Sequence, residues 1–298
     1  MDPSQIMNFI FTGALTGSVY ALIALGYSLV YGVGGIMNLS HGAYFMFTGY
    51  MLLWLLSIPI FAGLEFLTAI IALILITIIG GLTYLLLIKP LQESHVAVVI
   101  VTFGLAFLLE QIVTASPSGT EVWSIYQLKL AEGFTRFLGY PIIHQYILLI
   151  IISLAVVILF ALFISKSKLG RSIRAVSQDR EAATLMGINA NRVTLYTVMI
   201  SAFLAGLAAF LYLPGSTIDG PSMGWRYLTN SFAVVILGGM GSLVGSVVGA
   251  FIIGYTISFT NIFIPVYGPA WAHLVPILVI IIMLLIRPRG LFGKKELK

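Results

Sequence analysis

The sequence contains no cysteine, so the chain forms no disulfide and offers no thiolate ligand to a metal. Charge is scarce as well: charged residues make up 8% of the 298 residues, whereas soluble domains carry about 25%. Hydrophobic residues fill 60% of the chain. This balance excludes a soluble domain and indicates an all-α polytopic membrane protein, in which each apolar span is a helix. We expect a single transmembrane domain over residues 1–298.

The chain also lacks the sequence features of an enzyme. Its Gly293-Lys294 pair is followed by Lys295 in place of Ser or Thr, and Pro288 stands where a phosphate-binding loop begins with glycine. No cluster of residues suits a metal or a nucleophile. The net charge of +5 does not indicate nucleic acid, because the basic residues flank apolar runs, where topology and anionic lipid account for them. We expect no catalytic residues, no metal and no cofactor bound by this chain.

Eight apolar runs are long enough to cross a hydrocarbon core of about 30 Å as helices. Without a break in the longest run, the basic loop 166–192 and the basic C-terminal tail would lie on opposite sides of the membrane. We therefore expect this run to break at Gly238–Gly241, and we expect a second break at Gly32–Gly35. Gly-rich backbone is tolerated at membrane depth where it lines a cavity or packs against protein. The sequence predicts a bundle of eight to ten membrane-embedded helices, with the side of the N-terminus undetermined. The eight runs are 6–31, 36–58, 62–88, 95–115, 144–165, 193–213, 229–262 and 269–286.

The loop 166–192 is a long polar interruption that concentrates charge. It carries six of the fifteen basic residues against two acids, Asp179 and Glu181. By the positive-inside bias we expect this loop on the cytoplasmic side. Within it the sequence predicts a helix from Gln178 to Met186, with Ser177 as its N-cap and Gly187 as the left-handed residue that ends it. The same bias assigns to the cytoplasm the C-terminal residues Arg287, Arg289, Lys294, Lys295 and Lys298.

The predicted short helix has an apolar face formed by Ala182, Leu185 and Met186. Such a face suits insertion into a groove on another protein. It suits equally well an ordinary loop whose apolar face lies on the membrane surface. The pattern alone leaves both interpretations open.

Three stretches resemble a known family. The run Glu181–Ile188 (EAATLMGI), preceded by Gly170–Ala175 (GRSIRA), resembles the coupling segment of ABC importer permeases, a cytoplasmic helix that docks in a cleft of the ATPase subunit. Gly13–Gly42 and Val234–Gly249 resemble the branched-chain amino acid permeases, although Ser40 stands where that family commonly has Ala. The resemblance implies that ATPase coupling involves Asp179, Arg180, Glu181, Ala182, Ala183, Leu185, Met186, Gly187 and Ile188.

The same resemblance implies the partners. These are a second permease subunit, two ATPase subunits that would bind ATP and Mg²⁺, and an extracytoplasmic solute-binding protein. The protein would lie in the cell inner or plasma membrane. A platform for the binding protein is expected from the loops 116–144 and 214–229, whose aromatic residues equally suit plain interfacial anchoring.

Polar groups near the two breaks are candidates for the translocation path, and glycines at four-residue spacing are candidates for helix packing. For a single membrane histidine such as His41, one hydrogen bond to neighbouring backbone is the plainer interpretation. Glu110, near the outer end of its run, faces either a water-filled vestibule or headgroup water. The path candidates are Asn38, Ser40, His41, Gly239 and Gly241, and the packing candidates are Gly13, Gly17, Gly241, Gly245 and Gly249.

A rival functional class is a secondary transporter or channel that needs no partner and moves a small polar solute such as urea or an amide. An ion-driven carrier needs buried groups that bind the ion. The spans contain no buried charge pair or carboxylate relay in the sequence. This scarcity favours a permease that is powered by separate ATPase subunits.

Overall fold

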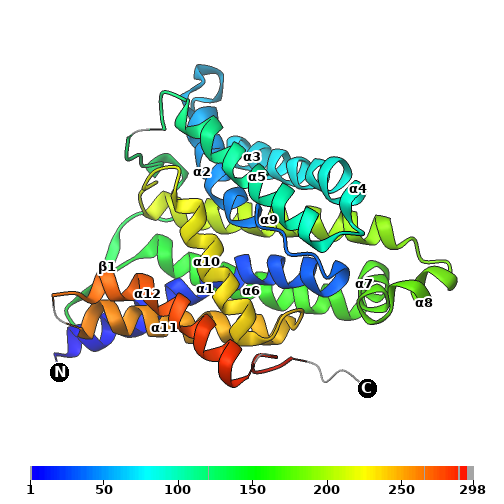
Figure 1. The fold of residues 1–298 in the computed structure, drawn as a ribbon. Coiled ribbons are helices and arrows are strands. Elements are labelled where there is room, and N and C mark those ends of the chain that lie inside the picture. Colours follow the sequence, from blue (N-terminus) through cyan, green and yellow to red (C-terminus); the bar gives the residue numbers. More distant parts are fainter. Residues whose placement is uncertain (1, 120, 265, 288, 294–298) are drawn as a thin grey trace.

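A computed structural model describes residues 2–119, 121–264, 266–287 and 289–293, so Lys294, Lys295 and Lys298 of the basic tail lie outside the described residues. The described part of the chain is a bundle of helices (Figure 1). The α-helices are α1 (Pro3–Gly34), α2 (His41–Ser57), α3 (Glu65–Leu82), α4 (Lys89–Leu91), α5 (His95–Thr114), α6 (His144–Lys166), α7 (Lys168–Gln178), α8 (Arg180–Leu185), α9 (Ala190–Tyr212), α10 (Met223–Gly238), α11 (Leu243–Phe263) and α12 (Gly268–Ile286).

Short elements complete the chain. Three 3-10 turns are η1 (Pro59–Phe61), η3 (Tyr126–Leu128) and η4 (Leu213–Gly215), and a π-helical segment, η2 (Thr83–Ile88), joins α3 to α4. The strands β1 (Phe134–Phe137) and β2 (Tyr140–Ile143) form an antiparallel hairpin. The hairpin was not predicted, and the loop expected over 214–229 ends at α10.

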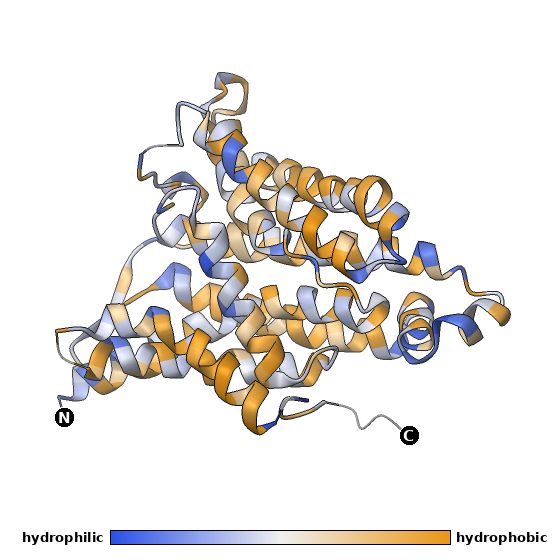
Figure 2. Ribbon diagram, viewed as in Figure 1, coloured by the Kyte–Doolittle hydropathy of each residue, from blue (hydrophilic) through white to orange (hydrophobic). Residues whose placement is uncertain are grey.

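Seven helical segments in the described residues are long and apolar enough to cross a membrane. They are α1, α3 with η2 and α4, α5, α6, α9 with η4, α11 and α12. Two shorter helices, α2 with 17 residues and α10 with 16, pack among them. The total agrees with the predicted eight to ten membrane-embedded elements. Figure 2 shows apolar residues along the long helices and hydrophilic residues gathered at α7 and α8.

Both predicted glycine breaks are confirmed. Helix α1 ends at Gly34, where Gly35 has a φ of 61°, and α10 is separated from α11 by Gly239 and Gly241, with φ values of 102° and 80°. These left-handed values favour glycine. The two breaks also meet, since a Cβ added to Gly32 would lie 3.2 Å from the Cα of Gly241.

Close helix packing surrounds α1, which lies at the centre of the bundle (Figure 1). A Cβ on Gly17 would lie 2.6 Å from a ring carbon of Phe251, and a Cβ on Gly254 would lie 2.5 Å from the backbone nitrogen of Gly17. The missing side chains therefore let α1 and α11 approach closely. On the other side of α11, a Cβ on Gly249 would lie 2.6 Å from the carbonyl oxygen of Val234 in α10.

The bundle has two distinct ends. Figure 1 places α7 and α8 at one end and the N-terminus with the β-hairpin at the other. The C-terminal segment lies at the α8 end, where α10 also ends. There the backbone N–H of Leu291 donates at 2.8 Å to the carbonyl of Leu237, in the last turn of α10. At the opposite end, the backbone N–H of Ile218 donates to the carbonyl of Trp123 at 2.9 Å, so the two loops between spans touch.

Candidate functional site

The short helix of the 166–192 loop begins later than predicted. Ser177 lies inside α7 and its hydroxyl donates to the carbonyl of Arg174, so it caps no helix. The chain turns at Asp179, whose φ of −155° and ψ of 112° are extended. Its carboxylate accepts the backbone N–H of Ala182 at 2.9 Å and so caps α8. The predicted start of the helix was therefore wrong, because Asp179 and not Ser177 is the N-cap.

The end of α8 follows the prediction. Gly187 is left-handed at a φ of 85°. Its N–H donates to the carbonyl of Thr184, and the N–H of Ile188 donates to the carbonyl of Ala183, each at 3.0 Å. This pair of hydrogen bonds is the Schellman arrangement, which satisfies the last carbonyls of a helix. Both ends of this six-residue helix are thus closed by its own chain.

Helix α8 presents its apolar tip to solvent. Leu185 is 88% exposed and Met186 is 83% exposed, and Ala182 beside them is exposed too. Ala183 faces the other way and is buried. The predicted apolar face therefore exists without a cover inside the described residues, whereas Ala183 holds α8 to the bundle.

Arg180 connects α8 to two other elements. Its Nη2 donates to the Oδ1 of Asn191 in the first turn of α9 at 2.6 Å, and to the Oε1 of Gln92 between α4 and α5 at 3.1 Å. The hydroxyl of Tyr84 also reaches Asn191, at 3.4 Å. Arg180 therefore bonds α8 directly to α9 and to the connection between α4 and α5.

The candidates at the first break are buried between helices. The Nε2 of His41 lies 2.8 Å from the carbonyl oxygen of Ile23, and its Nδ1 lies 3.0 Å from the hydroxyl of Ser201. Because a carbonyl only accepts, Nε2 carries the proton and Nδ1 accepts from Ser201. His41 thus makes one more hydrogen bond than the plain interpretation supposed, and it joins α2 to α1 and α9.

Asn38 and Ser40 form a compact polar turn before α2. The Oδ1 of Asn38 accepts the backbone N–H of Ser40 at 3.1 Å and its hydroxyl at 2.6 Å, and this hydroxyl also lies 2.9 Å from that of Tyr44. The Nδ2 of Asn38 is buried without a hydrogen-bond partner among the described residues. An unpaired buried amide costs about 1–3 kcal/mol. Of the second group of path candidates, Gly241 packs against Gly32 at the first break, whereas Gly239 packs against Gly293 of the C-terminal segment.

Glu110 is a partner of another helix. Its Oε2 accepts the indole N–H of Trp225 at 2.5 Å, which joins α5 to the first turn of α10. Trp225 lies 5.2 Å from Phe103, measured between ring centroids. The carboxylate therefore holds two helices together at this point.

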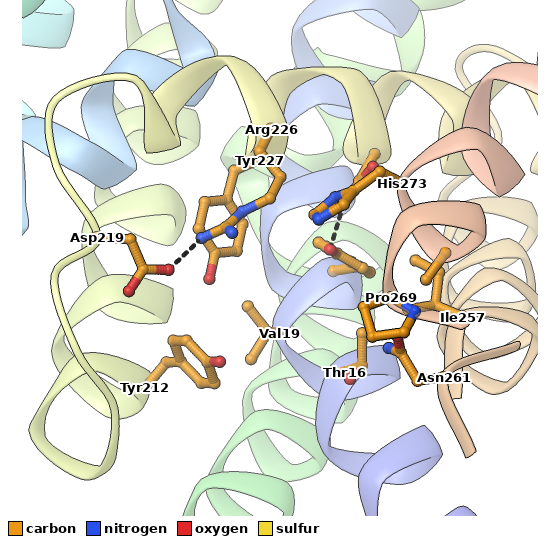
Figure 3. Close-up of a pocket in the computed structure, with 13 residues that line it drawn as sticks. Thr16, Val19, Tyr212, Asp219, Arg226, Tyr227, Ile257, Asn261, Pro269 and His273 are labelled. Atoms are coloured by element: carbon orange, nitrogen blue, oxygen red, sulfur yellow. Dashed lines mark hydrogen bonds and ion pairs between the residues drawn. The ribbon is translucent and has the colours of Figure 1, made fainter. Parts of the chain in front are cut away.

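A cavity of about 240 Å³ lies at the end of the bundle opposite α8. Side chains from α1, α10, α11 and α12 line it, together with Tyr212 and Asp219 (Figure 3). Val19, Ile257 and Ala272 give it apolar walls, whereas Asp219 and Arg226 add opposite charges. Sequence reasoning missed this cavity, although Asp219 and Arg226 are the charged residues of one short loop and the helix that follows it.

The two charges form an ion pair. The Nη2 of Arg226 lies 2.8 Å from the Oδ2 of Asp219, and the other carboxylate oxygen accepts from the hydroxyl of Thr217 at 2.6 Å. Burial raises the pKa of the Asp219 carboxyl, but the hydrogen bonds from Arg226 and Thr217 lower it by more, so the net pKa lies below its ordinary value. Asp219 is therefore ionised at neutral pH.

Comparison with known proteins places these features in a family. A family model described as branched-chain amino acid transport system, permease component, matches residues 9–284. The chain belongs to this permease family. The match contains both glycine breaks, α8 and every residue that lines the cavity at the end opposite α8.

Individual relatives match over the whole length of the permease. The chain is 29% identical to the high-affinity branched-chain amino acid transport system permease protein BraD of Pseudomonas aeruginosa, over 99% of this chain and 96% of BraD. It is 25% identical to the permease protein LivH of Escherichia coli, over 97% and 96% of the two chains. Among solved structures, PsaBC from Streptococcus pneumoniae in complex with Fab has a similar fold, with a TM-score of 0.51 and 17% identity over 95% of this permease and 94% of that chain.

Proposed function

We propose that this chain is a membrane-spanning permease subunit of an ATP-driven ABC importer for branched-chain or related amino acids, and that it works as one half of a permease pair. Family membership supports the transport class. The relatives BraD and LivH, which are branched-chain amino acid permease proteins that match over nearly their whole length, support the substrate class. The observation that carries the proposal is α8, a capped helix whose apolar tip is exposed while Arg180 ties its base to the bundle.

The α8 end of the bundle faces the cytoplasm in this proposal. Basic residues gather there, including Lys166, Arg171 and Arg192, and Arg289 of the C-terminal segment lies close to Gly239 at the same end. Short loops rich in Lys and Arg stay on the cytoplasmic side. The N-terminus and the β-hairpin then lie outside the membrane, at the opposite end (Figure 1).

The tip of α8 docks in a cleft of an ATPase subunit. Leu185 and Met186 expose most of their apolar surface to water, and burial of a Leu side chain contributes about 1.5–3 kcal/mol. Because Asp179 and Gly187 close the two ends of α8, little order has to be gained on docking. Two ATPase subunits, each bound by one permease subunit, would supply ATP and Mg²⁺.

An extracytoplasmic solute-binding protein delivers the substrate at the other end. The loops 116–143 and 216–222 touch there through the backbone of Trp123 and Ile218. Glu121 and Val122 next to this contact are exposed. The exposed carboxylates and apolar groups of this joined surface provide the contacts for that partner.

The test is reconstitution of the complete complex in proteoliposomes. We expect leucine uptake that requires ATP, the ATPase subunits and loaded binding protein together. The control complex carries a catalytically inactive ATPase and should give no uptake. Uptake by this permease alone, driven by an ion gradient, would instead establish the partner-independent class of transporter.

A further inference from the structure

We call the cavity at the end opposite α8 the outer cavity, because the proposed orientation puts it outside the cytoplasm. It contains the ion pair of Arg226 and Asp219, which can form more hydrogen bonds than it does. Arg226 and Asp219 remain 37% and 45% exposed in their side chains, so both are reached from the cavity. A guanidinium carries five N–H groups, and among the described residues one of them serves Asp219. An ionised carboxylate accepts about four hydrogen bonds, and Asp219 receives one on each oxygen. Both charges can therefore bind a further polar group.

The rest of the cavity is suited to a small apolar body. Figure 3 shows Asp219 and Arg226 at one side and Asn261 with Pro269 at the other, with Val19 between them. Pockets for drug-sized ligands hold about 300–1,000 Å³. A volume of about 240 Å³ therefore fits a smaller solute. The chemistry required is one anionic group, one cationic group and an apolar side chain.

We propose that this cavity binds the zwitterion of an amino acid with an apolar side chain on its way into the translocation path. Arg226 binds the α-carboxylate, Asp219 binds the α-ammonium group, and the apolar wall near Val19 and Ile257 receives the side chain. This site rests on the proposed import function and adds a substrate contact within the permease itself.

Electrostatics favour a zwitterion over a singly charged solute. The nearest atoms of the Arg226 guanidinium and the Asp219 carboxylate lie 2.8 Å apart. An anion bound to Arg226 would therefore be repelled by Asp219, and a cation bound to Asp219 would be repelled by Arg226. A zwitterion aligned against the pair puts each of its charges beside the opposite one. Charge-assisted hydrogen bonds to both groups then form together.

A purely structural role for the ion pair is the competing interpretation. Asp219 lies in the loop before α10 and Arg226 lies in its first turns, so the pair also fixes this loop. Loss of transport in a charge variant fits both roles. Protection of a thiol in the cavity wall by a bound ligand separates the two roles, because a purely structural ion pair would bind no ligand.

The natural absence of cysteine supplies the assay. Thr16→Cys places a thiol in the cavity wall, in a complete complex made with cysteine-free partner subunits and held in proteoliposomes without ATP or binding protein. The rate of modification by methyl methanethiosulfonate is measured with and without leucine. At a leucine concentration about ten times the dissociation constant, roughly nine tenths of the sites are occupied, so the rate falls about tenfold.

Matched ligands and variants sharpen the assay. The amide 4-methylpentanamide keeps the leucine side chain and carries neither charge, so it should leave the rate unchanged. Arg226→Gln and Asp219→Asn should each abolish protection by leucine. Asp2→Asn removes an exposed charge at the N-terminus, at the same end of the bundle and outside the cavity, and should keep the protection. If the rate of thiol modification without ligand is the same in these variants as in Thr16→Cys alone, the cavity is intact.

The outcomes separate this inference from the proposed function. If the complex imports leucine with ATP while leucine leaves the Thr16→Cys rate unaltered, the binding site is wrong and the import function stands. Protection that survives in Arg226→Gln, or equal protection by the uncharged amide, also overturns the site. Absence of ATP-driven uptake overturns the import function, and protection measured without ATP then reports on the cavity independently.

Discussion

The guanidinium of Arg180 donates to the side-chain oxygen of Asn191 at 2.6 Å, so the exposed helix α8 is bonded directly to the first turn of the membrane-crossing helix α9. The tip of α8 and its base thus have different partners. The tip is exposed to solvent, and the base is hydrogen-bonded to α9. This arrangement fits the proposed coupling role of α8.

Removal of that bond should uncouple the transporter. Arg180→Ala leaves Leu185 and Met186 in place, so we expect normal assembly with the ATPase subunits but less leucine imported per ATP hydrolysed. A hydrogen bond to a charged group contributes about 1.5–3 kcal/mol. Asn191→Ala should have a similar effect.

The double variant provides the control. If the two side chains act through their mutual bond, the loss of coupling in Arg180→Ala with Asn191→Ala should be little worse than in either single variant. It should fall short of the sum of the two single losses by about the coupling energy of a contacting pair. Strictly additive losses of coupling in the uptake-to-hydrolysis ratio would contradict a role for this bond.

Leu185→Asp should abolish the stimulation of ATP hydrolysis by loaded binding protein. Leu185 is 88% exposed, so the change has little effect on the fold of the permease itself. Loss of about 1.5–3 kcal/mol of apolar burial corresponds to roughly a tenfold to hundredfold weaker contact, and a buried charge adds to it. The control is Ile60→Asp, which alters an apolar side chain in η1 that is also largely exposed, at 76%. If Leu185→Asp shows stimulation as large as the wild type, α8 has no role in coupling and is an ordinary surface segment.

A series at Gly187 tests the helix stop without altering the tip. Among the residues that the structure describes, no atom lies within 4 Å of a Cβ added there, so the effect of a side chain arises from the φ of 85°. A left-handed conformation costs a residue with a Cβ about 1–2 kcal/mol, least for Asn and most for a β-branched side chain. We expect ATPase stimulation to fall in the order Gly187→Asn, Gly187→Ala, Gly187→Val. An equal response to all three would mean that the stop has no part in coupling.

Local signals in the sequence were sufficient for the glycine breaks and for the end of α8. Gly239, Gly241 and Gly187 all have positive φ, a conformation in which glycine has no steric penalty, so the residue type itself identifies the turn. The start of α8 is different, because Ser177 and Asp179 are both good N-caps. Burial of Ile173 and Val176 extends α7 past Ser177, and that tertiary contact has no signature in the local sequence.

The outer cavity depends on contacts over long distances in the chain. Thr16, Arg226 and Ile257 come together only through the packing of α1 against α10 and α11. Sequence spacing carries no information about such an arrangement. The burial of Asn38 and Ser40 has the same origin, because the turn before α2 is covered by helices from both halves of the chain.

His41→Ala should destabilise the permease without a direct effect on coupling. It leaves the carbonyl of Ile23 and the hydroxyl of Ser201 without their partner inside the bundle. Each unsatisfied buried group costs about 1–3 kcal/mol. We expect a lower midpoint of thermal unfolding in detergent, partly restored by His41→Gln, which can still donate to Ile23. A midpoint unchanged in His41→Ala would show that these two hydrogen bonds contribute nothing to stability.

The last prediction concerns the turn before α2 as part of the translocation path. Asn38 and Ser40 are 2% and 0% exposed in this conformation, so Asn38→Cys and Ser40→Cys should be protected from a water-soluble thiol reagent whenever the protein adopts it. The unpaired Nδ2 of Asn38 favours a second conformation in which water or substrate reaches this turn. We therefore expect both thiols to react in one nucleotide state of the assembled complex and to be protected in the other. Ser258→Cys, buried in α11 at a site where the native hydroxyl donates to the carbonyl of Phe9, is the matched control and should stay protected in both states. If Asn38→Cys and Ser40→Cys behave like this control, the turn is a fixed part of the core and the path runs elsewhere.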